Sequence, residues 1–262
     1  MIDTIQMVLG AFSGALVGFT LGLVGGGGSI LAVPLMVYLV GVQNPHVAIG
    51  TSALAVAVNA AMGLFNHARH GTVKWRCGFT FAAAGVVGAF AGSTAGKAFD
   101  GQRLLFLFAI VMILVGILML RRRNVVGNED AECNRQNAVK VLGYGLGTGS
   151  FSGFFGIGGG FLVVPGLISS TGMPILFAVG SSLVAVTAFG LTTALSYASS
   201  GLILWTLAAV FVAGGIVGSL IGTRIATRLA NRKGALNLVL ASLIVVVALY
   251  MLYRTAATLG WI

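Results

Sequence analysis

Residues 22–34 read GLVGGGGSILAVP and place four consecutive glycines, Gly25, Gly26, Gly27 and Gly28, inside a strongly apolar stretch. In a helix interior, glycine is about 1 kcal/mol less favourable than alanine. The run therefore predicts that one helix ends at the glycines and that a second begins directly after them, at Ser29. The consequence of such a break depends on whether water or lipid surrounds it.

The composition indicates an integral membrane protein. Of the 262 residues, 58% are hydrophobic and 8% are charged, whereas a typical soluble domain has about 25% charged residues. The apolar runs are too long for the alternating strands of a β-barrel. We therefore expect an all-α, multi-pass protein whose helices satisfy the backbone within the lipid. The apolar run from Ile5 is expected to be the first membrane segment, because it continues beyond the core of a signal peptide.

The net charge of +10 comes from 15 basic and five acidic residues. In a membrane protein, basic residues gather in cytoplasmic loops, so we interpret the charge as a signal of topology and expect no nucleic-acid partner. The two cysteines, Cys77 and Cys133, share no metal-ligand spacing. They are expected to be unpaired structural residues.

The glycine stretch occurs twice in the chain. GGGGSILAVP (25–34) aligns without gaps on GIGGGFLVVP (156–165), and the match continues with IGTSALAV (49–56) on VGSSLVAV (179–186) and HGTVKW (70–75) on SGLILW (200–205). The sequence therefore predicts two membrane repeats, 1–121 and 138–262, which a polar cytoplasmic linker, 122–137, connects.

Each repeat divides into five apolar segments. The expected segments are 5–24, 29–42, 46–66, 77–98 and 104–120 in the first repeat, and 141–157, 161–172, 174–198, 205–227 and 235–253 in the second. The second segment of each repeat is shorter than the roughly 20 residues of a spanning helix. These short segments are expected to be broken or re-entrant near the membrane midplane.

The basic clusters predict the relative orientation of the repeats. The three clusters are Arg69, Lys74 and Arg76; Arg121–Arg123 with Arg135 and Lys140; and Arg224, Arg228, Arg232 and Lys233. If all three face the cytoplasm, each repeat crosses the membrane an odd number of times. The two repeats then have inverted topology, and both termini lie outside the cytoplasm.

Inverted repeats with an interrupted apolar segment in corresponding positions are typical of secondary transporters, whose substrate lies at the interruptions. A helix start presents unpaired N–H groups and the positive end of the dipole, which favour an anion. The predicted substrate-binding residues are the glycines and the hydroxyl residues that recur in both repeats: Gly25, Gly26, Gly27, Gly28, Ser29, Thr51, Ser52, Gly156, Gly158, Gly159, Gly160, Ser181 and Ser182.

Simpler interpretations exist for several of these residues. Membrane serines and threonines often bond to their own helix, and small residues often only let helices pack closely. The latter suffices for the stripes Gly88/Gly92/Gly96 and Gly214/Gly218/Gly222. Asn59 is either an interhelical hydrogen bond, which we favour, or a one-sided substrate contact. His67, Arg69, Asn59 and Tyr197 are candidates for a gate at the ends of the pathway.

The distribution of acidic residues excludes several functions. All five (Asp3, Asp100, Glu129, Asp130 and Glu132) lie at termini or in loops, whereas many pumps and proton-coupled carriers use buried carboxylates. A phosphate-binding loop for ATP and the motifs of intramembrane proteases are also lacking. We expect neither an enzyme nor a bound metal or cofactor, and we predict a carrier with an anion-selective interior.

The paired motifs GLVGGGGSILAVPLM, AIGTSALAV and HGTVKW, with FSGFFGIGGGFLVVPGL and VGSSL, resemble the TauE/SafE family of sulfite and sulfonate exporters along nearly the whole chain. The resemblance implies transport of a small organic or inorganic sulfur anion, such as sulfite or sulfoacetate, across the inner membrane of a prokaryote. It also implies that the motif glycines, with Thr51, Ser52, Ser181 and Ser182, form the centre of the site.

Two alternatives remain open at this stage. The first is an anion-selective channel, and the second is a non-transporting membrane subunit that docks a partner through the basic loop 121–140. A homodimer is also left open. The sequence predicts neither the direction of transport nor the coupling ion.

Overall fold

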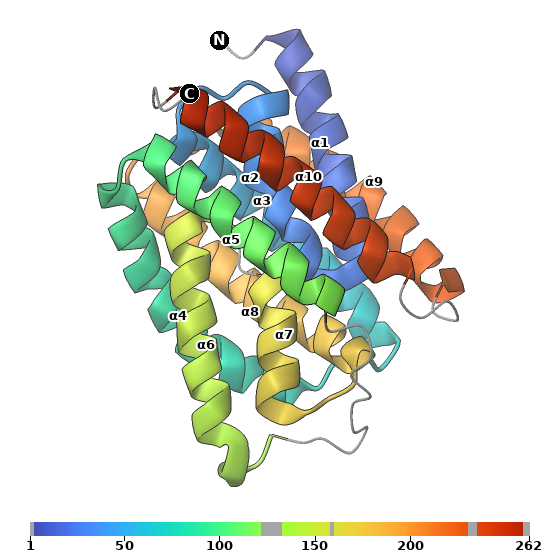
Figure 1. Ribbon diagram of the computed structural model, residues 1–262. Coiled ribbons are helices and arrows are strands. Elements are labelled where there is room, and N and C mark those ends of the chain that lie inside the picture. Colours follow the sequence, from blue (N-terminus) through green and yellow to red (C-terminus); the bar gives the residue numbers. More distant parts are fainter. Residues whose placement is uncertain (1–2, 122–132, 158–159, 230–234, 259–262) are drawn as a thin grey trace.

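The computed structural model describes residues 3–121, 133–157, 160–229 and 235–258, and these ranges form helices without any strand (Figure 1). The helix boundaries follow the predicted segments closely, and the glycine motifs separate the first two segments of each half. The elements are α1 (Thr4–Val24), η1 (Gly25–Leu31, a 3₁₀ helix), α2 (Ala32–Pro34), η2 (Leu35–Leu39, a π-helix), α3 (Pro45–Arg69), α4 (Trp75–Ala98), α5 (Gly101–Arg121), α6 (Arg135–Phe155), α7 (Gly160–Thr171), α8 (Ile175–Ala198), α9 (Trp205–Leu229) and α10 (Ala235–Thr258).

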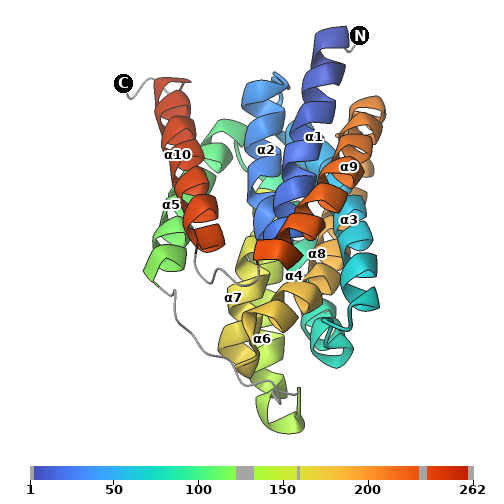
Figure 2. The same cartoon turned by 90° about the vertical axis from the view of Figure 1, so that its right-hand side faces the viewer.

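Each half begins with a helical hairpin whose tip is the glycine motif. After α1, the helical stretch Gly25–Leu39 runs back beside it, as Figure 2 shows, and Gly28 packs on the backbone of Thr20 in α1. In the second half α7 runs back along α6, and Gly166 of α7 lies beside Thr148 of α6. The second helical stretch starts at Gly25 rather than at the predicted Ser29, because Gly25 itself makes the turn and the following glycines coil tightly.

The glycine stripes pack helices of opposite halves against each other in parallel. Gly14 and Gly18 of α1 contact Phe211 and Gly215 of α9, so the contacts advance along both helices in the same direction. In the same way Gly149 and Gly153 of α6 contact Gly85 and Ala89 of α4. The packing interpretation is confirmed for both predicted stripes, whose members meet the backbone or side chains of α6 (Gly88, Gly92, Gly96) and the backbone of α1 (Gly214, Gly218, Gly222).

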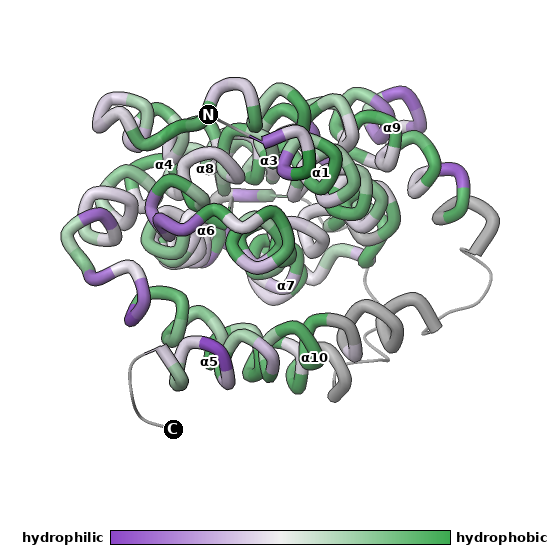
Figure 3. Tube along the Cα trace, turned by 90° about the horizontal axis from the view of Figure 1, so that it is seen from above, coloured by the Kyte–Doolittle hydropathy of each residue, from purple (hydrophilic) through white to green (hydrophobic). Residues whose placement is uncertain are grey.

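The remaining helices form a centre and an outer layer. Helices α3 and α8 cross in the middle of the protein, where Gly190 packs on Ala57. Helices α5 and α10 pair with each other and form a separate layer on one side (Figure 3). Helix α1 begins and α10 ends at the same end of the molecule (Figures 1 and 2).

Six helices in the described ranges are long and apolar enough to span a membrane, as judged by length and composition. The predicted segment 141–157 corresponds to the glycine-rich α6, which is not among the six. The six candidate spans are Thr4–Leu23, Pro45–Arg69, Trp75–Ala98, Gly101–Leu118, Ile175–Ala198 and Trp205–Ile225.

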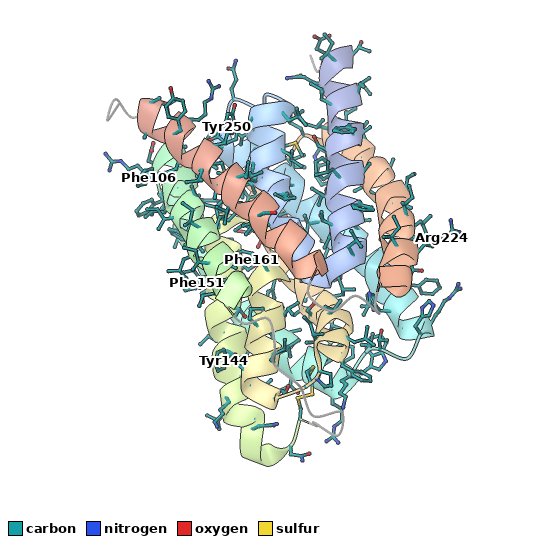
Figure 4. All side chains as sticks on the ribbon, turned by 45° about the vertical axis from the view of Figure 1, so that its right-hand side comes forward. Phe106, Tyr144, Phe151, Phe161, Arg224 and Tyr250 are labelled. Carbon is teal, nitrogen blue, oxygen red and sulfur yellow. A yellow bond between two sulfur atoms is a disulfide. The ribbon has the colours of Figure 1, made fainter. Side chains whose placement is uncertain are left out.

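The two cysteines are paired, which contradicts the prediction that they are free. A disulfide joins Cys77 in the first turn of α4 to Cys133, two residues before α6, with the two Cα atoms 5.3 Å apart (Figure 4). The two cysteines are 56 positions apart, with α5 and part of the linker between them, so their sequence spacing carries no sign of the contact. In the chain-entropy description, closing a loop of this length raises the free energy of unfolding by about 4 kcal/mol, because it restricts the unfolded chain.

Protein purified without reductant is therefore expected to contain no maleimide-reactive thiol after denaturation. Treatment with dithiothreitol should expose both cysteines. In the Cys133→Ser variant, which serves as the control, Cys77 should react without reductant. Two reactive thiols in air-oxidised wild-type protein would contradict the disulfide.

The disulfide also bears on which side of the membrane the start of α4 faces. Arg69, Lys74 and Arg76 lie next to Cys77 and predict a cytoplasmic position, whereas disulfides persist in the periplasm and are rare in the cytosol. The two indicators point to opposite sides of the membrane. Labelling of Cys77 in intact cells by an impermeant maleimide, after an impermeant reductant, distinguishes the two sides.

Candidate functional site

The tips of the two hairpins meet inside the protein. A side chain at Gly26 would lie 2.6 Å from Gly160 Cα, and one at Gly160 would overlap the carbonyl group of Gly26. The two backbones are therefore in direct contact through these glycines. The predicted break residues of the two halves are thus brought together.

Positive backbone φ angles produce the two turns. Gly25 has φ of 67° and Gly156 has φ of 69°, a region that glycine adopts without strain. Gly25 faces Val179 of α8, and Gly156 faces Ile49 of α3, so each tip lies on the helix of the third segment of the opposite half. Gly27 and Gly28 are also buried. Gly158 and Gly159 lie outside the described residues.

Thr51 and Ser181 link the two halves through their hydroxyl oxygens. Thr51 Oγ1 accepts a hydrogen bond from the N–H of Leu204 at 3.0 Å, and Ser181 Oγ accepts one from the N–H of Lys74 at 2.8 Å. Leu204 and Lys74 directly precede α9 and α4. Each hydroxyl therefore satisfies a backbone N–H at a helix start, and its own proton stays available for another acceptor.

Ser52, Ser182 and Ser29 use their protons within their own segments. Ser52 Oγ donates to the carbonyl of Ile49 at 3.0 Å, and Ser182 Oγ donates to that of Val179 at 2.7 Å. Ser29 Oγ donates to the carbonyl of Gly26 at 2.9 Å. The four recurring hydroxyls thus form two classes, of which Thr51 and Ser181 have the uncommitted donor.

The tips are closed to solvent. Gly25–Gly28, Ser29, Thr51, Ser52, Ser181 and Ser182 are all buried. One cavity, of about 470 Å³, lies instead at the end of the molecule where α1 begins, between Gln6, Asn44 and Leu204. The described residues of both tips are therefore shielded from solvent by the surrounding helices.

The candidate gate residues His67 and Arg69 lie at the C-terminal end of α3. His67 Nδ1 is hydrogen-bonded to Thr72 Oγ1 at 2.9 Å, and its buried Nε2 has no hydrogen-bond partner among the residues that the structure describes. Thr72 in turn contacts Gly180, directly before Ser181. Arg69 is exposed, and its guanidinium lies 4.1 Å from the centre of the Phe65 ring. His67 therefore lies close to the Ser181 link, whereas Arg69 points towards the surroundings.

Tyr197 takes the corresponding place near Thr51. It is fully buried and contacts Gly50, and its hydroxyl has no hydrogen-bond partner within the described ranges. Lys97 Nζ donates to the carbonyl of Ser196 at 2.8 Å and to Ser200 Oγ at 3.0 Å, and lies 5.8 Å from the centre of the Tyr197 ring. The ammonium group thus caps the carboxyl end of α8, where cations are favoured.

Asn59 does not make the interhelical hydrogen bond that we favoured from the sequence. It is fully buried, and neither Nδ2 nor Oδ1 has a hydrogen-bond partner in the part of the chain that the structure describes. Its amide group packs on Gly215 of α9. The prediction of a helix-to-helix hydrogen bond is wrong because the facing residue on α9 has no side chain.

Sequence reasoning missed the partners of the hydroxyl residues. The N–H groups of Lys74 and Leu204, and the close packing of Gly50 on Leu202 and of Gly180 on Thr72, complete the two links. The sequence did contain a signal for them, because HGTVKW (70–75) aligns with SGLILW (200–205) and places Lys74 and Leu204 at the same position of the two motifs. Every residue except proline has a backbone N–H. The recurring motifs therefore did not reveal that these N–H groups donate hydrogen bonds to Thr51 and Ser181.

Comparison with known proteins agrees with these motifs. Residues 10–251 match the profile of the family described as "Sulfite exporter TauE/SafE". The chain belongs to the TauE/SafE family. With six candidate spans, this TauE/SafE protein is a multi-pass membrane protein.

Relatives of this TauE/SafE protein extend over most of its length. A "Probable membrane transporter protein" of Xylella fastidiosa (strain Temecula1) is 51% identical and covers 98% of this chain and 99% of its own. "Probable membrane transporter protein YdhB" of Bacillus subtilis is 26% identical over 76% of this chain and 82% of its own. "Probable membrane transporter protein YunE" of the same organism is 28% identical over 80% of this chain and 83% of its own. No solved structure matches the chain significantly.

Proposed function

We propose that this protein is a secondary transporter that moves small sulfur-containing anions, sulfonates such as sulfoacetate or sulfite, across the inner membrane of a prokaryotic cell. The observation that carries the proposal is the contact of two glycine hairpin tips, Gly26 on Gly160, in the buried centre. The description of the family as sulfite exporters and the naming of the relatives as membrane transporters support it.

The transporter is built from two inverted repeats in this proposal. The support is that contacts recur with the halves exchanged. The packing contact of Gly25 with Val179 corresponds to that of Gly156 with Ile49. The hydrogen bond from Leu204 to Thr51 corresponds to the one from Lys74 to Ser181. The parallel pairs α1–α9 and α6–α4 correspond in the same way. A site at the axis between inverted repeats is the usual arrangement of such transporters.

The anion is held by uncharged donors. An isolated charge in an apolar interior must be hydrogen-bonded, and the N–H groups at the starts of the two tip helices supply donors and positive dipole ends. The hydroxyl protons of Thr51 and Ser181 make no hydrogen bond among the described residues, so each hydroxyl is free to donate to the anion on its way to or from the tips. A site of this kind holds its ligand without a buried arginine and releases it when the helices separate.

Alternating access follows from the two links. The hydrogen bond from Leu204 to Thr51 and the bond from Lys74 to Ser181 lie at corresponding places of the two halves. In the proposed cycle one link opens while the other stays closed, so that the tips face one side at a time. The buried tips correspond to the occluded stage, with both links made.

Thermal unfolding tests ligand recognition directly. Purified protein is expected to unfold at a higher temperature with sulfite, thiosulfate, sulfoacetate, isethionate or taurine than with matched chloride or nitrate. A ligand at 100 times its Kd stabilises the folded state by about 2.7 kcal/mol, which gives a clear shift. The absence of a shift with every sulfur anion would contradict the proposed substrate class.

Counterflow in liposomes separates a carrier from the alternatives. A carrier is expected to take up labelled sulfonate faster when unlabelled sulfonate is inside the vesicles. A channel would instead show single-channel currents without stimulation by internal substrate. Vesicles that move no anion would favour a docking role for the basic loop 121–140.

A further inference from the structure

Asn59 lies where three helices meet. It stands in the middle of α3 (Pro45–Arg69), and its amide group occupies the space where a side chain of Gly215 on α9 would be. Gly215 in turn packs on Gly18 of α1. The exposed fraction of Asn59 is 0%, and neither polar atom of its amide has a hydrogen-bond partner among the described residues.

An amide in this state lowers the stability of the protein. A buried polar group without a hydrogen bond costs about 1–3 kcal/mol, and native proteins rarely contain such groups. The packing does not require an amide, because the corresponding residue of the other half is Phe189, which lies on Gly85 as Asn59 lies on Gly215. The polar group at position 59 therefore calls for a ligand rather than a packing role.

The position of Asn59 relates it to the anion site. Two residues before it, Ala57 packs on Gly190 where α3 crosses α8. Gly26 of the first hairpin tip packs on Val186, one helical turn before Gly190 on α8. Because α3 and α8 run in opposite directions, Asn59 lies on the side of Ala57 that faces Val186, at about the level of this tip along the helix axis. It is therefore placed to contact the far end of a small ligand whose head lies at the tip.

We propose that Asn59 is a specificity-determining residue, which binds the second polar group of a short-chain sulfonate whose charged head lies at the hairpin tips. Its Nδ2 donates to, or its Oδ1 accepts from, a hydroxyl, amino or carboxylate group of the substrate. Phe189, stacked on Phe81 with 6.4 Å between ring centres, keeps the corresponding position of the other half apolar. The inference rests on the proposed function and names the preferred class: sulfonates with a polar substituent.

Two sulfonates that differ by one polar group test this inference. Isethionate has a hydroxyl group where ethanesulfonate has a hydrogen atom. Wild-type protein is expected to bind isethionate at least about tenfold more tightly, which corresponds to about 1.4 kcal/mol. In Asn59→Leu this preference should disappear through weaker isethionate binding, with ethanesulfonate binding retained and the unfolding temperature of the ligand-free protein unchanged or raised.

Asn66→Leu is the matched control, because it makes the same substitution further along α3, and it should retain the wild-type preference. Asn59→Ala provides a second variant with a smaller change of volume. A wild-type preference in both Asn59 variants, or equal wild-type binding of the two sulfonates, would overturn the role of Asn59 while leaving the transporter proposal intact. Wild-type protein that binds no sulfonate would instead overturn the proposed function.

Discussion

Leucine at Gly160 is expected to abolish anion transport. The first carbon of the new side chain would overlap the carbonyl group and Cα of Gly26. Both obstacles are backbone atoms, so no rotamer change can relieve the overlap, and the two hairpin tips must separate. Because the proposed anion site is formed by these tips, uptake of labelled sulfonate into proteoliposomes should fall to the level of empty vesicles.

Two further variants distinguish loss of the site from loss of the fold. Gly147→Leu makes the same substitution on α6, where nothing lies within 4 Å of the added carbon, and should transport at the wild-type rate. Gly160→Ala, with its single added carbon, should assemble in the membrane and transport more slowly than wild type. Normal transport by Gly160→Leu at normal protein levels would show that the hairpin tips do not form part of the transport pathway.

Valine at Thr51 is expected to weaken the link to α9 and to slow transport strongly. Valine has nearly the shape of threonine but cannot accept the hydrogen bond that Leu204 donates at 3.0 Å. The orphaned N–H costs about 1–3 kcal/mol, and the anion loses one hydroxyl donor. We expect a lower unfolding temperature, weaker stabilisation by sulfonates and a transport rate reduced by about tenfold or more, on the scale set by 1.4 kcal/mol.

The chain offers controls for this substitution. Thr51→Ser retains the hydroxyl and should restore most of the transport rate. Thr80→Val makes the identical change at a half-buried position of α4, where the Thr80 hydroxyl donates to the carbonyl of Arg76 in its own helix, and should behave as wild type. Ser181→Ala should reproduce the effect of Thr51→Val from the opposite half. If Thr51→Val binds and transports sulfonate normally, the hydroxyl is a packing element and not a ligand donor.

The elements of the fold could be predicted from sequence because their signals are local. Apolar runs bounded by glycine, proline and charge gave helix boundaries close to those of α3, α8 and α9. The recurring glycine motifs also indicated where the helices break. The exception, the start of the second helical stretch at Gly25 rather than Ser29, arises because glycine can enter a tight helical turn that the propensity argument did not consider.

The site was predictable only as a set of residues. The sequence identified the recurring glycines and hydroxyls but could not separate Thr51 and Ser181, which accept hydrogen bonds from the opposite half, from Ser52 and Ser182, which bond to their own helices. Neighbouring hydroxyls on a helix point in different directions, and their partners depend on which helix packs there. The same reason explains the failure at Asn59, whose expected partner proved to be a glycine.

By itself, the sequence determined the membrane character, the helices, the two glycine breaks and the family, because each follows from composition or from residues close together in the chain. Tertiary structure alone decided that Gly26 meets Gly160, that Cys77 is bonded to Cys133, and that Asn59 is buried without a partner. These features join segments far apart in the chain. Their physical cause is close helix packing through glycines, because a glycine stripe shows in the sequence that a helix packs closely but not which distant segment it meets.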